Sequence, residues 1–240
     1  MKHRHPGRNP PRPLPLEANE ATFRALEEAY REAVRLGFLG PRETARLRER
    51  HLDDAVGLAA IRPPAAGERW VDLGSGAGLP GLPLALGHPE THFTLVDAQR
   101  RRLDWVAGTA ARLGVGNLTV VHARLEEYAH GTARATFDVG TARALGPLPV
   151  VAELGLPLLR VGGLLLIPRG QPAAEELEQA AEACRQLGGR IDDVVPNPSS
   201  PIDRVGFVVI MAKIAATSPR FPRRSGLPAR SPLGRRHTQT

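Results

Sequence analysis

Apolar residues recur along this chain with two different periods. Up to residue 61 they follow helical spacing, in one stretch from residue 20 to Gly37 and in a second that restarts at Pro41. One face of the second expected helix is formed by Leu47, His51, Ala55 and Leu58. The chain is therefore expected to begin with a short helical extension.

From residue 69 the pattern changes to short apolar runs separated by helical stretches, which is typical of βαβ units and a mostly parallel sheet. The expected strands are residues 69–73, 92–96, 118–122, 137–141, 162–168, 190–195 and 205–212. The last two are separated by "PNPSSPID" rather than by a helical stretch, which predicts an antiparallel hairpin with residues 205–212 inserted into the sheet. The expected fold is α/β, with helices on both faces of a seven-stranded, mostly parallel sheet.

The length and composition fit one such domain. The chain has 240 residues, enough for a single α/β core with extensions. The lone Cys184 excludes a disulfide framework and a cysteine zinc site, and no apolar run approaches the roughly 18 residues of a membrane-spanning helix. A cytoplasmic protein without a membrane or metal partner is expected. Its expected divisions are a basic, proline-rich tail over 1–17, the helical extension over 18–62, the α/β domain over 63–214 and a basic tail over 215–240.

The net charge of +7 is concentrated at the two ends. Residues 1–14 and 215–240 carry basic residues and no acidic ones, so the chain between them is net negative. Arginine-rich ends favour a nucleic-acid partner. Because Lys2 and Lys213 are the only lysines, a GC-rich coding sequence is an alternative explanation of these arginines.

A glycine-rich turn, "WVDLGSGAGLPGLPLAL" over residues 70–86, follows the first expected strand. Its glycines fit the G-x-G-x-x-G of dinucleotide-binding folds and also the acid-then-glycine turn of S-adenosylmethionine (SAM) methyltransferases. Asp97, at the end of the second strand, is placed to bind ribose hydroxyls, which NAD and SAM share. Asp72 at the end of the first strand and the terminal hairpin favour SAM, and the chain has no Tyr-x-x-x-Lys motif for hydride chemistry.

The turn and its continuation resemble the RsmG/GidB family of bacterial small-subunit rRNA methyltransferases, which methylate a guanine at N7, and its actinobacterial members in particular. The similarity extends through "GFLGPRETARLRERHLDDAV", "FTLVDAQRRRLDWV", "ARLEEY", "FDVGTARALGPLPVVAELGLPLLRVGGLLLIPRG" and "PRFPRRSGLPARSPL". His51 and Asp54 stand in the family's His-x-x-Asp positions, although two helical residues one turn apart also form ordinary hydrogen-bonded pairs. The resemblance covers roughly residues 20 to 234 and implies a class I SAM methyltransferase fold.

Together the turn and the resemblance give a set of expected site residues. The residues expected to bind SAM are Asp72, Gly74, Ser75, Gly76, Gly78, Leu79, Asp97, Leu125, Glu126 and Arg143. Arg143, which follows the fourth strand, is also expected to act in catalysis, the alternative being a surface arginine on a loop. Spacing alone would make Glu126 the charged start of a helix. The residues expected to contact RNA are His51, Arg169, Arg220, Phe221, Arg223 and Arg224.

Three positions depart from the family pattern. Arg169 replaces the usual lysine before Gly170, while Arg48 and Ala55 stand where tryptophan and serine are common. Arginine keeps the charge of lysine but replaces a compact ammonium with a planar fork. These departures bear on the RNA footprint more than on the cofactor site.

The residues also bear on which atom is methylated. Guanine N7 carries its own lone pair, so its methylation needs positioning rather than a general base or a covalent nucleophile. Cys184 lies on a late expected helix, far in sequence from the strand ends, and the Asn-Pro-Pro-aromatic motif of exocyclic-amine methyltransferases is missing from "GTARALGP". A ring nitrogen is therefore the expected acceptor. A small-molecule methyltransferase and a non-catalytic, nucleotide-binding RNA-interaction protein remain as alternatives.

Overall fold

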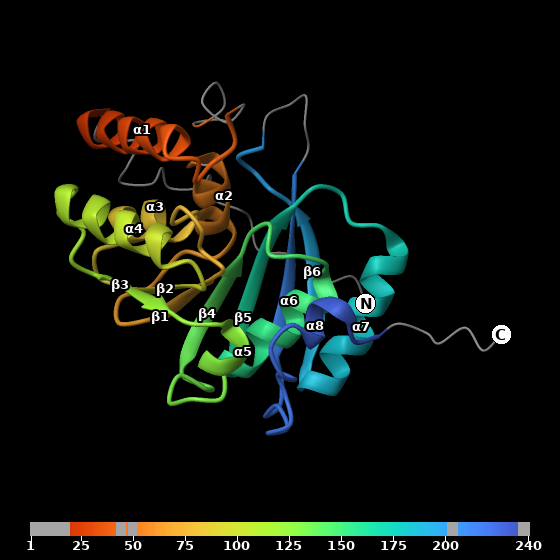
Figure 1. Ribbon diagram of the computed structural model, residues 1–240. Coiled ribbons are helices and arrows are strands. Elements are labelled where there is room, and N and C mark those ends of the chain that lie inside the picture. Colours follow the sequence, from red (N-terminus) through yellow and green to blue (C-terminus); the bar gives the residue numbers. More distant parts are fainter. Residues whose placement is uncertain (1–19, 42–46, 48–51, 201–205, 235–240) are drawn as a thin grey trace.

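The computed structural model describes residues 20–41, 47, 52–200 and 206–234 (Figure 1). They contain a seven-stranded sheet in the order β3-β2-β1-β4-β5-β7-β6. The strands are β1 Arg69–Leu73, β2 His92–Asp97, β3 Leu118–His122, β4 Phe137–Ala142, β5 Leu159–Arg169, β6 Gly189–Pro196 and β7 Phe207–Lys213. The expected α/β fold is thereby confirmed.

The end of the sheet has the predicted hairpin. β1 to β5 pair in parallel, whereas β7 runs antiparallel to both of its neighbours, so that Val209 lies opposite Ile167 of β5 and Val194 of β6. β7 is thus an internal strand and β6 forms the edge. The helix before the hairpin ends at Leu187, where Gly188 adopts φ +73° and turns the chain into β6.

Helices cover both faces of the sheet (Figure 1). One face packs against α1 Glu20–Arg35, α2 Asp53–Ile61, α3 Gly81–Gly87 and α4 Arg100–Arg112. The other packs against α5 Leu125–Tyr128, α6 Leu148–Gly155, the short 3-10 helix η3 Leu156–Leu158, α7 Ala174–Leu187 and α8 Leu227–Arg230. No described helix is both long and apolar enough to cross a bilayer.

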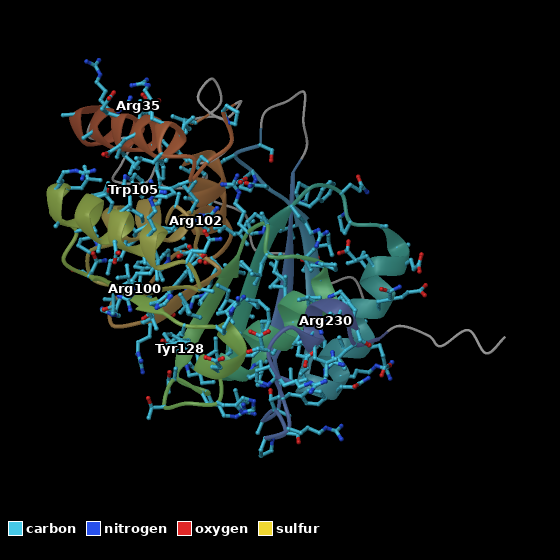
Figure 2. All side chains as sticks on the ribbon, viewed as in Figure 1. Arg35, Arg100, Arg102, Trp105, Tyr128 and Arg230 are labelled. Atoms are coloured by element: carbon cyan, nitrogen blue, oxygen red, sulfur yellow. The ribbon has the colours of Figure 1, made fainter. Side chains whose placement is uncertain are left out.

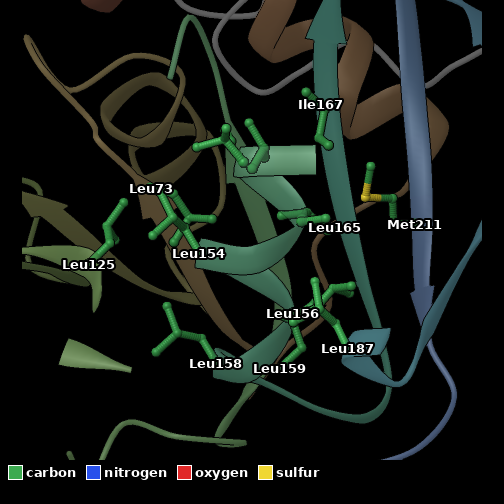
Figure 3. Close-up of a cluster of buried hydrophobic side chains, with 14 of the residues drawn as sticks. Leu73, Leu125, Leu154, Leu156, Leu158, Leu159, Leu165, Ile167, Leu187 and Met211 are labelled. Carbon is green, nitrogen blue, oxygen red and sulfur yellow. The ribbon is translucent and has the colours of Figure 1, made fainter. Parts of the chain in front are cut away.

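Alternation along the strands divides the core into two layers. Trp70 and Val208 belong to the cluster under α1–α4, whereas their neighbours Val71 and Val209 belong to the cluster under α5–α8. Figure 3 shows the second cluster, in which leucines of β1, β5 and α6 interlock beside Met211 of β7. Both layers consist of buried apolar side chains, which hold in place the strands whose ends carry the site.

The N-terminal extension is part of this core. Tyr30 of α1 is fully buried, and its ring centroid lies 6.0 Å from that of Trp105 on α4. The second expected helix is described only as α2, beginning at Asp53, because residues 42–46 and 48–51 lie outside the described part of the chain. Leu47, Ala55 and Leu58 of the expected apolar face are buried.

Residues 214–234, the C-terminal segment, do not form the separate tail that the sequence suggests. The guanidinium of Arg134 donates to the carbonyls of Thr217 and Phe221, each at 2.8 Å. The buried Lys213 ammonium donates to the carbonyl of Leu187 at 2.9 Å and to the hydroxyl of Thr217. Since these partners come from the loop before β4 and the end of α7, the segment is fastened to the α5–α7 face. Residues 235–240 lie outside the described part.

Candidate active site

The glycine turn between β1 and α3 has the conformation that its sequence requires. Gly74, Gly76 and Gly78 have φ values of +64°, +54° and +75°, a region that residues with a side chain rarely adopt. A Cβ atom on Gly74 would also lie 2.6 Å from Cδ1 of Leu145. The turn therefore needs glycine for both its shape and its close packing.

Asp72, at the end of β1, anchors the far side of the turn. Its Oδ2 accepts a hydrogen bond from the Gly81 amide at 2.9 Å, and its Oδ1 accepts one from the Thr141 hydroxyl at 3.1 Å. Burial raises the pKa of this carboxyl to about 7, because the hydrogen bonds to Gly81 and Thr141 only partly offset desolvation. The site thus holds an acid whose charge changes near neutral pH.

Asp97, at the end of β2, holds the near side of the turn. Its Oδ2 accepts from the Gly76 amide at 2.8 Å, while its Oδ1 accepts from the Gln99 amide at 2.8 Å. Each carboxylate oxygen can accept a further hydrogen bond. The carboxylate that is expected to bind ribose is thus fixed in orientation beside the turn.

Ser75 gives a direct test of whether the turn fits a ligand. Its hydroxyl is buried and has no hydrogen-bond partner among the described residues, a condition that it shares only with Nε2 of His88. Buried polar atoms nearly always have a hydrogen-bond partner, so an unpartnered hydroxyl beside a glycine turn indicates that a bound ligand supplies the missing partner. The Ser75 hydroxyl and the two carboxylates match the amino-acid and ribose groups of SAM.

Leu125 and Glu126 begin α5, after β3. Leu125 is buried in the second core cluster. The Oε1 of Glu126 accepts a hydrogen bond from the Gly226 amide at 2.8 Å, so this carboxylate binds the C-terminal segment. The expected contact of Glu126 with adenine stays a prediction. The hydrogen bond to Gly226 brings the C-terminal segment up to a residue of the expected cofactor site.

Arg143 follows β4 directly and is held by the N-terminal extension. Its Nε lies 3.2 Å from Oδ2 of Asp54 on α2, and its side chain is 15% exposed. The sequence suggested an intrahelical pair of Asp54 with His51, but His51 lies outside the described residues. The ion pair fixes the planar guanidinium at the carboxyl end of the sheet, where α/β folds bind ligands.

The residues expected to contact RNA divide into two groups. Arg169 is paired with Glu176 at 2.9 Å, and Arg223 is paired with Glu153, whose side chain is fully buried. Phe221 is only 4% exposed, so its ring packs in the core rather than standing ready to stack on a base. Arg220 and Arg224 are exposed. The burial of Phe221 argues against the expected contact of its ring with RNA, whereas Arg220 and Arg224 keep accessible charge.

Three residues that the sequence did not single out also contact the site. Thr141 donates to Asp72, and the Tyr30 hydroxyl donates to the Gly78 carbonyl at 3.4 Å. The side chain of Arg102, labelled in Figure 2, reaches within 3.7 Å of the point where a Cβ on Gly76 would lie. Only Arg102 had a local signal, since it belongs to the basic run that opens α4. The other two are placed by the tertiary fold.

The described residues offer no alternative chemistry of the metal or thiolate kind. They contain no group of three His, Cys, Asp or Glu side chains that could hold a metal ion. Cys184 is fully buried on α7, and burial raises the pKa of its thiol to about 12, which disfavours the nucleophilic thiolate.

Solved structures share this architecture. A SAM-dependent methyltransferase from Aquifex aeolicus superposes with a TM-score of 0.54 at 18% identity, covering 73% of this chain and 100% of that one. A 16S rRNA (adenine-N1)-methyltransferase from Catenulisporales acidiphilia gives a TM-score of 0.53 at 17% identity, covering 70% and 93%. At such identities the likeness shows the fold, which is that of class I SAM methyltransferases.

Curated relatives are more similar in sequence. A ribosomal RNA small subunit methyltransferase G from Syntrophomonas wolfei is 36% identical over 218 residues, which cover 91% of this chain and 100% of that protein. One from Deinococcus radiodurans is 37% identical over 222 residues, covering 91% and 86%. The family model for rRNA small subunit methyltransferase G, GidB, matches residues 24–197. The match spans the glycine turn, both acids and Arg143, and the chain belongs to this family of SAM-dependent enzymes.

Proposed function

We propose that this protein transfers a methyl group from SAM to N7 of a guanine in small-subunit (16S) ribosomal RNA. Family membership together with the glycine turn and its two anchored carboxylates supports this function best. The proposed partner is the small ribosomal subunit or its rRNA, met in the cytoplasm by a monomeric enzyme.

SAM supplies a methyl group on a positively charged sulfur, which makes that methyl electrophilic. The Ser75 hydroxyl would bind its amino-acid end, with Asp72 facing the ammonium group. Asp97 would accept hydrogen bonds from the ribose, and Leu125 and Glu126 would flank the adenine. Of these groups Ser75 is the one that is buried and unpartnered among the described residues, which supports its role as a ligand contact.

To methylate guanine N7, the protein needs mainly to hold the two reactants in the right geometry. Guanine N7 has no proton to remove, so its lone pair needs only to be held in line with the departing sulfur. Arg143 is suited to bind the guanine edge through O6, to which a guanidinium can donate a hydrogen bond. A second hydrogen bond to N7 would occupy the lone pair that receives the methyl group, so Arg143 would leave N7 free.

RNA binding would draw on exposed arginines. Arg220 and Arg224 are exposed on the C-terminal segment, whereas Arg169 and Arg223 have acidic partners. The logarithm of the RNA affinity falls linearly with the logarithm of the salt concentration, and each phosphate contact adds nearly one to the steepness of that slope. Replacing Arg220 and Arg224 together by glutamine should reduce that slope by up to about two.

The test of the proposed function is transfer of tritiated methyl from SAM to small ribosomal subunits from a strain that lacks its own N7 activity. Label recovered in N7-methylguanosine after nucleoside analysis is the expected result. Label in a different nucleoside would refute the target atom. Label confined to a small-molecule fraction would refute the RNA substrate and favour a small-molecule methyltransferase.

A further inference from the structure

Asn197 is the first residue of the connection between β6 and β7, and its side chain contacts the N-terminal extension. It follows β6 directly and is 5% exposed. Its side-chain amide nitrogen donates to Oδ1 of Asp54 at 3.3 Å, while Oδ2 of the same carboxylate lies 3.2 Å from Nε of Arg143. Three segments far apart in sequence thus meet in one chain of polar contacts that ends at the proposed catalytic residue.

The hairpin itself fixes which way the Asn197 amide points. The side-chain oxygen of Asn197 accepts a hydrogen bond from the Ser199 amide at 3.1 Å. The main chain of Asn197 donates to the Gly206 carbonyl at 2.8 Å, and Ser200 holds the Gly206 amide through its hydroxyl at 2.9 Å. Because its oxygen is occupied by the hairpin, the amide presents its NH2 group to Asp54.

Gly57 of α2 provides the room for this contact. A Cβ atom at residue 57 would lie 1.8 Å from the side-chain oxygen of Asn197, so no other residue fits there with Asn197 in place. Glycine is a poor helix former, and its position inside α2 serves close packing rather than helix stability. The helix and the hairpin are matched to each other at this point.

We propose that Asn197 is a positioning residue that orients Arg143 through Asp54, an inference that rests on the proposed role of Arg143. One oxygen of the Asp54 carboxylate is tied to the hairpin, so the carboxylate cannot rotate freely, and its other oxygen fixes the plane of the guanidinium. A misaligned guanidinium would hold the guanine edge at the wrong angle, and alignment of reacting groups has large effects on rate.

Three single substitutions separate this role from simple hairpin stability. Asn197→Ala removes the Asp54 contact, and Asn197→Asp keeps an acceptor for Ser199 but sets a second carboxylate against Asp54. Ser200→Ala is the matched control, because it loosens the same hairpin without touching Asp54. Turnover on small ribosomal subunits should fall about fivefold for Asn197→Ala and more for Asn197→Asp, but stay within about twofold for Ser200→Ala. Thermal unfolding checks that each variant is folded.

A double substitution tests the route through Asp54. Asn197→Ala should have no further effect on turnover in an Asp54→Asn background, since residues acting through one contact are not additive. Fully multiplicative effects, or a loss in Ser200→Ala equal to that in Asn197→Ala, would overturn the inference.

A second readout separates this inference from the proposed function. The 15N resonance of the Arg143 Nε–H group, assigned by its disappearance in Arg143→Lys, reports the guanidinium directly. It should shift or broaden in Asn197→Ala and not in Ser200→Ala. If the wild type methylates no RNA, the proposed function fails while this measurement still decides the positioning role: an unchanged resonance in Asn197→Ala refutes it.

Discussion

Replacing Arg223 by methionine should destabilise the whole domain, although a basic segment near a chain end looks expendable. Glu153 has no exposed side-chain surface, and Arg223 supplies its carboxylate with a backbone N–H at 2.8 Å and two guanidinium bonds at 2.8 and 2.7 Å. Methionine keeps the backbone bond and the apolar stem but removes both guanidinium bonds. At about 1.5–3 kcal/mol for each of the two bonds to a charged group, the expected loss is about 3–6 kcal/mol. A buried ion pair that loses one partner costs a similar amount, about 3–5 kcal/mol.

Urea denaturation of wild type, Arg223→Met and Arg224→Met measures this effect. Arg224 is the matched control, because it is the next residue and is exposed. The expected result is a lower midpoint for Arg223→Met alone, and in heating a drop in Tm on the order of 10 °C for a domain of this size. If both variants unfold within about 0.5 kcal/mol of the wild type, then the C-terminal segment does not belong to the cooperative core and the reasoning from Glu153 is wrong.

Four further predictions concern the cofactor site and the buried thiol. SAM affinity measured by calorimetry should rise between about pH 6 and pH 8 in the wild type, because Asp72, with its pKa of about 7, gains the charge that meets the ammonium group. The Asp72→Asn substitution should abolish this rise, and a flat wild-type profile would contradict the contact. Since the folded pKa of Asp72 lies above the ordinary value of 3.8 for an aspartate, the free energy of unfolding of the wild type should fall relative to Asp72→Asn as pH rises from about 4 to about 7. Gly74→Ala should weaken SAM binding about tenfold through its φ of +64° and its clash with Leu145, and adding Leu145→Ala should recover only the part due to the clash. Cys184→Ala should keep turnover within about twofold, because the buried thiol takes no part in the reaction; a folded but inactive variant would refute this.

The fold was predictable because its signals are local. Residues 69–73 and 118–122 are the observed bounds of β1 and β3, because each strand coincides with a short, mostly apolar run between turn residues. β5 begins at Leu159, before the expected start at residue 162. The pattern missed this start because Gly162 and Gly163 interrupt the apolar run that marks the strand. The insertion of β7 followed from the missing helix between the last two strands.

The site was predictable only where the backbone itself makes it. The spacing of the glycines in the sequence predicts the turn and the two carboxylates beside it. The side-chain pairs around the site have no such local signal. Glu153 lies 70 positions from Arg223, and Asn197 lies 143 positions from Asp54. Whether an arginine meets phosphate or a buried carboxylate depends on such distant partners, so a basic run near the chain end resembles an RNA-binding tail even where one of its arginines binds a buried carboxylate.

The place of β7 in the sheet has a consequence for how this protein is made. The chain leaves the ribosome in order, so β6 is synthesised before the strand that must separate it from β5. Until residues 207–213 have emerged, the hydrogen-bonding edge of β5 stays unpaired and β6 has no sheet to join. The C-terminal segment, with its bonds to Arg134 and Glu153, then seals the finished sheet. Completion of the fold therefore waits for the last part of the described chain, and a chain stalled during translation cannot assemble a stable domain.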